Sequence, residues 1–452
     1  MTKLFDDFDP VSAQAWKQKI QMDLKGADYN DTLIWHTREG IDVKPFYHRD
    51  DREDSFPHIE SNATNFRIQK DIFVANAQKS NEEAKKAIQE GVESISFYVP
   101  ESTDLTVLLS DLIDIPIHLS FETLNDAFIN QLASLSNQKN LYLHVDIIGH
   151  LARTGNWMHN LKEDHRLMES LVEKSGDFNS SLSIDMTLFQ NAGATMIQQL
   201  AYGLAQAAEY LNHFDKGNIR NNLVFKVAVG SNYFFEIAKI RAVRLLWNAV
   251  ADTFGINQNC VIVAMPSKRN KTLYDYNTNM LRTTTESMSA VLGGADFVQN
   301  MAYDAVYHKE NEFGNRISKN QLLILKHESY FDLVDNPADG AYYIENLTNL
   351  LAEKALDLFK DIESNGGLLA QLKEGTIQRK IKEAATKEQA SFDSGNYVLL
   401  GTNKHPNDED KMKDDLELYP FLKIDKRKTL IEPILEKRLA EKIEQERLNK
   451  EQ

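Results

Sequence analysis

The chain has 452 residues, 42% of them hydrophobic and 26% charged, which is typical of a globular protein with room for a large barrel or for two or three ordinary domains. Its 67 acidic and 51 basic residues give a net charge of -16 and argue against nucleic-acid binding as the main task. Cys260 is the single cysteine, so an intrachain disulfide framework and a cysteine-rich metal site are excluded.

The sequence shows no sign of export or of membrane insertion. It begins MTKLFDDFDP, without the basic and then apolar pattern of a signal peptide. No stretch of about 18 apolar residues follows it. We therefore expect a cytoplasmic protein that does not bind a membrane.

Residues 1–90 predict a helix and an extended arm. Val11–Lys25 has apolar residues at helical spacing, Thr32–His36 and Gly40–Tyr47 read as short extended pieces, and Asp50–Asn65 is polar. An arm with few contacts of its own is expected to lie against another surface. A partner subunit and the chain's own barrel are both open as that surface.

Between residues 91 and 365 short apolar strands alternate with amphipathic helices. The strands are β-branched or fully apolar, as in a parallel sheet covered on both faces. They are predicted at Ser94–Val99, Ile115–Phe121, Leu141–Ile147, Ser181–Met186, Leu223–Val229, Cys260–Met265 and Asp296–Met301. Seven such strands, with one weak strand missed, favour a (β/α)8 barrel of the TIM type over a doubly wound sheet, which usually begins with a glycine-rich turn.

Residues 366–452 predict a helical, linker-like region after the barrel. Its last helix is expected over Lys426–Gln452, with dense charge on one side. The apolar side would consist of Ile431, Ile434, Leu435, Leu439, Ile443 and Leu448. Because the charges are mixed in sign, this helix is expected to pack on the barrel and not on a membrane.

Few residues form a recognisable catalytic or metal-binding pattern. The chain lacks a Gly-x-Ser-x-Gly elbow, a Gly-x-x-x-x-Gly-Lys phosphate loop and a His-Glu-x-x-His zinc motif. His144 and His150 straddle a predicted strand end, a pattern that favours ordinary structural histidines over a metal site. Asp146 and Asp185 lie near strand ends, where a carboxylate serves either as an acid or base or as the cap of the next loop. Both roles are compatible with the sequence.

Four longer segments are not explained by amphipathic patterning. They are Ser181–Thr195 (SLSIDMTLFQNAGAT), Asp275–Gly294 (DYNTNMLRTTTESMSAVLGG), Arg316–Thr348 with its Asn-Pro-Ala-Asp-Gly-Ala-Tyr-Tyr turn, and Gly375–Lys404. Each resembles a segment of the adenosylcobalamin-dependent acyl-CoA mutases, methylmalonyl-CoA mutase above all, and together they span most of the chain in the family's order. The resemblance implies a (β/α)8 barrel.

The positions that would carry the family's chemistry differ here. In the catalytic members a histidine precedes the Gln-(Glu/Asn)-Ala-Gly-Ala-Thr run, and this chain has Leu188 at that position, followed by Phe189. An isobutyl group neither donates a hydrogen bond nor holds a proton. The family's substrate-side aromatic run and its His-(Ser/Cys)-Gln-Thr-Ser-Gly-Trp run correspond to Asn65–Asn76 (NFRIQKDIFVAN) and Ala264–Thr272 (AMPSKRNKT). The resemblance therefore implies a barrel without catalytic residues.

Glu286 matches an acidic residue of the family, but a helical ion pair with Arg282, four residues earlier, is the simpler explanation. The bulky replacements, with the basic pair Lys268 and Arg269 among them, predict a filled or blocked barrel interior. We expect that an acyl-CoA does not enter it.

The resemblance also bears on cofactor and domains. The family's corrinoid site is a flavodoxin-like domain with an Asp-x-His-x-x-Gly motif, whose histidine binds cobalt. This sequence contains no such motif, so no cobalamin-binding flavodoxin-like domain is expected in it. We expect no catalytic, cofactor-binding or metal-binding residues in this chain.

The resemblance implies that this chain is the small, non-catalytic subunit of a heterodimeric methylmalonyl-CoA mutase, an enzyme of propionate metabolism. Its large partner subunit would bind adenosylcobalamin and interconvert methylmalonyl-CoA and succinyl-CoA, and this chain would stabilise the partner. One alternative is an independent barrel enzyme acting on an acyl-CoA or small acid, with Asp146, Asp185 or Glu286 as its carboxylates. A second is an interaction protein that services the mutase.

Overall fold

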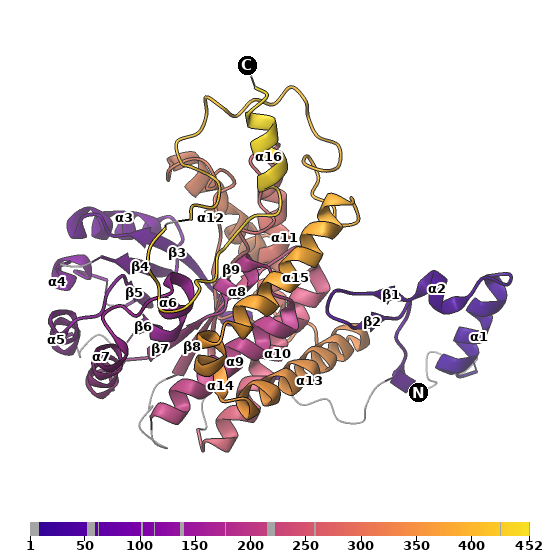
Figure 1. Ribbon diagram of the computed structural model, residues 1–452, viewed down its shortest axis with the longest axis horizontal. Coiled ribbons are helices and arrows are strands. Elements are labelled where there is room, and N and C mark those ends of the chain that lie inside the picture. The colour runs from indigo at the N-terminus through magenta and orange to yellow at the C-terminus, as the bar shows by residue number, and fades with distance from the viewer. Residues whose placement is uncertain are drawn as a thin grey trace.

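The computed structural model describes residues 9–51, 59–61, 63–100, 103–112, 114–135, 140–176, 178–214, 222–256, 259–424 and 426–451. Within these ranges eight strands close into a barrel, and a two-stranded antiparallel ribbon precedes it (Figure 1). The first eight residues and half of the polar stretch Asp50–Asn65 lie outside the described residues.

The barrel confirms the predicted fold class. Its strands are β3 (Arg67–Phe73), β4 (Ser94–Val99), β5 (Ile117–Phe121), β6 (Leu141–Val145), β7 (Ser180–Asp185), β8 (Asn222–Val229), β9 (Val261–Pro266) and β10 (Phe297–Gln299), paired in the closed order β10-β3-β4-β5-β6-β7-β8-β9. All neighbours are parallel, and β10 closes the ring by pairing with both β3 and β9. Outward residues such as Ile95 and Phe97 pack under helices, because βα connections place helices over the outer face.

The strand that the sequence analysis missed is β3, which lies inside the range assigned to the arm. Ile68 and Ile72 of this strand are buried, whereas Lys70 and Asp71 between them are partly or fully exposed. The other strands read as apolar runs, and this mixed pattern did not match them. The barrel therefore begins at Arg67, within the segment Asn65–Asn76 that corresponds to the family's aromatic run.

Helices surround the barrel and extend beyond it. Those between the strands are α3 (Ala77–Gln89), α4 (Leu105–Leu108), α5 (Asp126–Ser134), α6 (Ile147–Thr154), α7 (Leu161–Lys174), α8 (Thr187–Ala192), α9 (Met196–His213), α10 (Tyr233–Thr253) and α11 (Thr278–Leu292). After β10 come α12 (Glu312–His327), α13 (Tyr342–Ser364), α14 (Gly367–Lys373) and α15 (Thr376–Asp393). Helix α13 packs across α9 and α10, so the C-terminal helices thicken one side of the barrel (Figure 1).

The lumen of the barrel is rich in polar side chains, where this fold usually has branched apolar ones. Gln69 of β3 donates to Ser94 of β4 and accepts a hydrogen bond from Gln299 of β10, at 2.9 and 2.7 Å. Lys226 of β8 donates to the Ser120 hydroxyl of β5 at 3.0 Å. Two strands separate β5 from β8, so this bond crosses the lumen.

Three rings fill the lumen at one level. His118 of β5 and Tyr142 of β6 stack with ring centroids 4.4 Å apart, and Phe297 of β10 meets them edge-on at 4.3 and 5.2 Å. Because β10 is not a neighbour of β5 or β6, these contacts span the barrel. Val224 and Val263 join Phe297 in the same apolar cluster. The rings and aliphatic side chains therefore close the axis of the barrel at this level.

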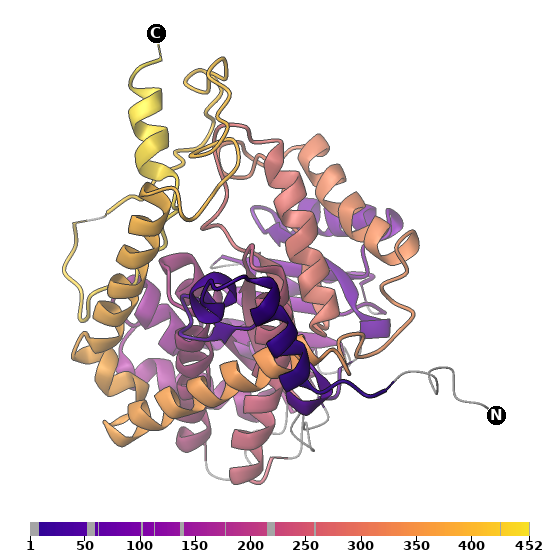
Figure 2. The same ribbon diagram turned by 90° about the vertical axis from the view of Figure 1, so that its right-hand side faces the viewer.

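The N-terminal arm projects from one side of the barrel (Figures 1 and 2). It consists of α1 (Ala13–Asp23), α2 (Tyr29–Leu33) and the ribbon of β1 (Trp35–His36) with β2 (Asp42–Val43). The ribbon contacts the chain's own barrel: Trp35 meets the Phe235 ring at 5.8 Å, and the Glu39 carboxylate accepts from the Ile197 N–H at 3.2 Å. Helix α1 buries none of its residues. The arm thus has one part attached to the barrel and one part free of it.

The prediction of a long helix over Lys426–Gln452 is wrong for most of its length. Only α16 (Glu441–Leu448) is helical, and residues 429–439, which we call the strap, form neither helix nor strand. Pro433 lacks an N–H and disfavours a helical residue before it, which explains the loss of helix here. Ile431, Ile434 and Leu439 of the strap are buried, so the apolar pattern was real but belongs to an extended segment.

Candidate functional site

A parallel barrel places its chemistry at the C-terminal ends of its strands. In this chain that end, which we call the mouth, comprises Asp146 after β6, Asp185 at the end of β7, helix α8, the loop 267–272 after β9, and Glu286 on α11. It contains the sequence-predicted site residues. Their contacts decide whether any of them is available to a substrate.

Leu188 and Phe189, at and beside the family's histidine position, lie in the barrel's main hydrophobic cluster with 1% of each side chain exposed. Helix α8 turns both inward, and the Phe189 ring meets Tyr202 of α9 edge-on at 5.5 Å. At this position the chain therefore offers a packing contact and no donor, acceptor or base.

The retained Gln-Asn-Ala-Gly-Ala-Thr run holds the mouth together. The side-chain oxygen of Asn191 accepts a hydrogen bond from the Ser267 hydroxyl at 3.0 Å and another from the Lys268 N–H at 2.9 Å. Thr195 caps α9 in a reciprocal capping box with Gln198. Gly193 has φ 96°, and a Cβ there would lie 2.7 Å from the Arg269 guanidinium. The run thus joins α8, α9 and the loop after β9.

Asp146 acts as the cap of α6. One carboxylate oxygen accepts from the Gly149 N–H at 2.7 Å, the Gln206 amide at 2.5 Å and the Tyr210 hydroxyl at 2.7 Å. The other accepts from the Asp185 N–H at 3.0 Å. Burial raises the pKa of Asp146 to about 6, against the lowering effect of these donors. The loop-capping role left open by the sequence is the one this geometry supports.

Asp185 is held by Arg153, which also binds the strap. The Arg153 guanidinium lies 2.9 Å from Asp185 and 2.5 Å from Glu436 of the strap. Asp185 further accepts from the Thr187 N–H at 3.0 Å and from its hydroxyl at 2.5 Å. Burial alone would raise the pKa of Asp185, but the Arg153 and Lys226 cations outweigh it and hold the pKa below its usual value. Asp185 is therefore an ionised structural anchor.

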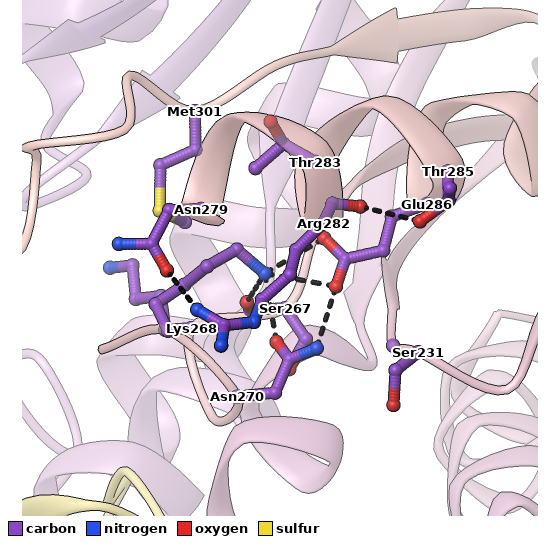
Figure 3. Close-up of polar contacts among 12 residues, drawn as sticks. Ser231, Ser267, Lys268, Asn270, Asn279, Arg282, Thr283, Thr285, Glu286 and Met301 are labelled. Carbon is purple, nitrogen blue, oxygen red and sulfur yellow. Dashed lines mark hydrogen bonds and ion pairs between the residues drawn. The ribbon is translucent and has the colours of Figure 1, made fainter. Parts of the chain in front are cut away.

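Glu286 forms a buried ion pair with Lys271 of the loop after β9. It also accepts a hydrogen bond from Asn270 of the same loop (Figure 3). The Lys271 ammonium lies 2.9 and 2.8 Å from the two carboxylate oxygens, and the Asn270 amide donates to one of them at 2.7 Å. Arg282, the predicted partner, instead donates to Thr272 and Asn279, both at 2.8 Å. That part of the sequence interpretation is wrong, because the loop brings a closer cation into the helix face.

Burial raises the pKa of the Glu286 carboxyl and lowers that of the Lys271 ammonium, and their mutual attraction opposes both shifts. Lys271 uses its remaining hydrogens on the Ser267 carbonyl and the Asn270 side-chain oxygen, both at 2.8 Å. The pair is thus enclosed and satisfied on both sides, so this geometry supports a structural role for Glu286.

The basic pair of the loop does not fill the lumen. Lys268 is exposed, and Arg269 turns toward α15 and the strap, with Nε 2.5 Å from the Glu388 carboxylate and a terminal nitrogen 2.7 Å from the Lys437 carbonyl. What closes the lumen is the ring group of His118, Tyr142 and Phe297.

The strap runs across the mouth and bonds in turn to the end of α6, to α8 and to the loop after β9. The Ile431 and Ile434 N–H groups donate to the Gly155 and Ala152 carbonyls, and those of Lys437 and Leu439 donate to the Asn191 and Arg269 carbonyls. These four hydrogen bonds are 3.1, 2.8, 3.1 and 2.9 Å long. The Asn191 amide adds a bond of 2.8 Å to Glu436. The chain's own C-terminal segment therefore covers the side of the mouth formed by the elements that follow β6, β7 and β9.

Two features of the lumen were missed by sequence reasoning. His144 pairs with His118 at 2.8 Å and not with His150, because β5 and β6 are neighbours and the sequence spacing gives no hint of this. Lys226 sits inside a strand that otherwise reads as apolar, LVFKVAV. A lysine in a strand buried on both faces was the signal that would have found it.

Within the described ranges, histidine, cysteine and acidic side chains form no group of three or more suited to a metal ion. The polar groups of the mouth bind one another, and the strap lies over them. Among the described helices, none combines the length and apolar character needed to cross a bilayer.

Fold and mouth together define a class of protein: a (β/α)8 barrel whose mouth carboxylates are engaged by its own cations and donors. A family model described as methylmalonyl-CoA mutase matches residues 136–450. The chain belongs to the methylmalonyl-CoA mutase family.

Three relatives show how the chain relates to this family. The methylmalonyl-CoA mutase small subunit of Porphyromonas gingivalis is 33% identical over 90% of this chain and 71% of its own length. The large subunit of the same organism is 33% identical over 56% of this chain and 36% of its own length. The methylmalonyl-CoA mutase of Rhizobium meliloti is 30% identical over 85% of this chain, which spans 63% of that protein.

Proposed function

We propose that this chain is the small, non-catalytic subunit of a heterodimeric methylmalonyl-CoA mutase. In this proposal the large subunit binds adenosylcobalamin and interconverts methylmalonyl-CoA and succinyl-CoA, and this chain stabilises it by association. The observation that carries the proposal is the packing of Leu188 in the hydrophobic core at the family's histidine position.

The contacts of the three carboxylates at the mouth support the proposal that this chain is non-catalytic. An independent barrel enzyme would need Asp146, Asp185 or Glu286 free to reach a substrate. Instead Asp146 caps α6, Asp185 binds Arg153, and Glu286 binds Lys271. The similarity to a protein named as a small subunit, in an organism that also has a large subunit, supports the partner.

The free part of the arm supports association. Trp16 and Met22 of α1 are 52% and 75% exposed, and the helix buries no residue in the chain itself. Apolar side chains exposed on one helix favour contact with another protein. We assign this helix to the interface with the large subunit.

The test is co-expression with the large mutase subunit of the same organism. We expect an equimolar complex that turns over methylmalonyl-CoA. Its kcat should stay within about twofold when Asp185→Asn and Asp146→Asn are introduced into this chain, because neither side chain touches the substrate in this proposal.

Substitution of the large subunit's own catalytic histidine is the matched control, and it should abolish turnover. The outcome that rejects the proposal is an isolated chain that is stable and active without any partner, with activity lost on Asp185→Asn. That result would favour an independent barrel enzyme.

A further inference from the structure

The lumen of the barrel contains a lysine, Lys226, that forms no direct ion pair among the described residues. Lys226 projects inward from β8, on the side of the strand that carries Val224 of the lumen cluster. Among the described residues its ammonium has one hydrogen bond, to Ser120, and no carboxylate within ion-pair distance. Asp185, its neighbour across the β7–β8 register, is engaged by Arg153 and Thr187.

A partly buried charge of this kind is costly unless something compensates it. Lys226 and Ser120 are both partly exposed, so solvent reaches them inside the barrel. Phe73 and Tyr98, at the ends of β3 and β4, are 61% and 38% exposed and stack on each other. Side chains on this side of the mouth are therefore in contact with solvent, whereas the strap crosses the side of β6 to β9.

Two buried imidazoles lie next to this cation. His144 is the register partner of Ser120, and its Nε2 lies 2.8 Å from Nδ1 of His118. Burial, reinforced by the Lys226 ammonium, lowers the pKa of both imidazoles well below the usual value. Both are therefore neutral at pH 7, and one shared proton links them.

The outer nitrogens of this pair, His144 Nδ1 and His118 Nε2, are buried and have no hydrogen-bond partner among the described residues. Whichever tautomer forms the inner bond, a neutral pair exposes one donor and one acceptor at its two ends. Buried polar atoms of this kind are normally satisfied. Lys226 and the histidine pair thus give two independent indications of a polar ligand in the lumen.

We propose that the half of the lumen nearest the mouth binds a small monocarboxylate, with the Lys226 ammonium as its counter-ion and Ser120 and His144 as its polar neighbours. The ring group of His118, Tyr142 and Phe297 limits the ligand to a few carbon atoms, because it closes the axis below. The inference does not depend on the proposed association with a large subunit.

Charge selects a monoanion over phosphate. A single ammonium balances a single negative charge, and the ionised Asp185 on the adjacent strand repels a second one. The ring group also leaves no passage along the full length of the lumen for the long chain of an acyl-CoA.

The experiment is a calorimetric titration of the full chain with sodium propionate at pH 7, with ionic strength held constant by sodium chloride. We expect saturable binding to one site, and at least a tenfold loss of affinity in Lys226→Met. The matched control is Lys268→Met, which removes an exposed lysine at the mouth and should bind propionate as the wild type does. His144→Gln tests the second indication and should weaken binding several-fold.

Folding of the key variant is checked by its melting temperature without ligand. Lys226→Met removes an unpaired, partly buried charge, so the melting temperature should stay equal or rise. Absence of saturable propionate binding by the wild type, or equal affinity in Lys226→Met, would overturn the proposal. Tighter binding of inorganic phosphate, or competition by an acyl-CoA, would contradict the assignment to a small monocarboxylate.

Discussion

Glu286 and Lys271 form an ion pair that is almost completely withdrawn from water, with side-chain exposures of 0% and 1%. Around it the other mouth residues are tied in the same manner, Asp185 to Arg153 and Arg269 to Glu388. Removing water from such groups costs free energy that the pairing recovers only when both partners are present. Loss of one charge of such a pair should therefore lower the stability of the protein much more than loss of both charges.

This asymmetry gives a prediction for the pair. Glu286→Gln leaves the Lys271 ammonium buried without a counter-charge, and we expect the free energy of unfolding to fall by about 3–5 kcal/mol. The double variant Lys271→Met with Glu286→Leu should recover most of this loss, because no charge remains to be buried. Denaturant unfolding of the single and double variants measures both values. A double variant as unstable as the single one would show that the pair does more than balance charge.

Asp146 gives a prediction that depends on pH. Its pKa is raised from 3.8 to about 6, so the folded protein holds this proton more tightly than the unfolded chain does. Ionisation of Asp146 then lowers stability as pH rises from about 4 to about 6, and the loss is complete above that range. The unfolding free energy of the wild type minus that of Asp146→Asn should decrease over this interval and then level off.

The measurement is denaturant unfolding of both proteins at intervals between pH 4 and pH 7.5. If the unfolding free energy of the wild type minus that of Asp146→Asn increased with pH instead, the pKa of Asp146 would be shifted in the opposite direction. This result would mean that the four hydrogen-bond donors around Asp146 outweigh its burial and lower its pKa.

Single residues explain why part of the candidate site was predictable from sequence. The burial of Leu188 and the absence of a donor at its position follow from its side chain alone. The ion-pair partner of Glu286 could not be predicted from sequence, because Lys271 lies 15 residues away and reaches Glu286 through a loop. The pairing of His118 with His144 depends on strand order, which sequence spacing does not give.

At the scale of elements, the strap and the strands differ in how far sequence predicts them. Seven strands were predictable because a parallel strand buried on both faces is an apolar run. β3 was missed because its lumen side is polar, and the strap was mistaken for helix because Ile431, Ile434 and Leu439 also fit a helical period. Regular spacing of apolar residues indicates which side chains are buried. It does not by itself show whether the backbone that carries them is helical or extended.

The strap gives a prediction with a matched glycine control. Gly155 has φ 80°, and a Cβ there would lie 2.7 Å from the Ile431 carbonyl oxygen of the strap. Gly255 has φ 70° and nothing within 4 Å. Gly255→Ala should cost about 1–2 kcal/mol for its left-handed backbone alone, whereas Gly155→Ala should cost more and also displace the strap.

Limited trypsin digestion distinguishes the two variants. Lys426, Arg427 and Lys428 precede the strap and offer cleavage sites, so we expect faster cleavage there in Gly155→Ala than in the wild type or in Gly255→Ala. Equal cleavage rates in both variants would show that the strap does not depend on its close approach to Gly155.

At the scale of the whole molecule, the barrel and the arm have separate roles in stability. Helix α1 contributes an aromatic contact to Phe46, at 5.7 Å from Trp16, and no buried residue. Replacing its exposed side chains therefore changes the isolated chain little, and any large effect belongs to an intermolecular contact.

We expect the double variant Trp16→Ala with Met22→Ala to unfold within about 0.5 kcal/mol of the wild type. Its affinity for the large subunit should fall at least tenfold, measured by calorimetry or by surface binding. Val107→Ala, which removes an apolar side chain that is 41% exposed on α4, serves as the control and should leave the affinity unchanged. Unchanged affinity of the double variant would place the interface elsewhere on the barrel.

The strap also fixes the order in which the molecule is completed. Its hydrogen bonds to the loops of the mouth join residues at least 167 positions apart, as between Arg438 and Lys271. Contacts of such long range form only after the intervening chain has folded, and the strap follows every strand of the barrel in the chain. The barrel is therefore assembled with its mouth uncovered, and the strap covers one side of the mouth afterwards.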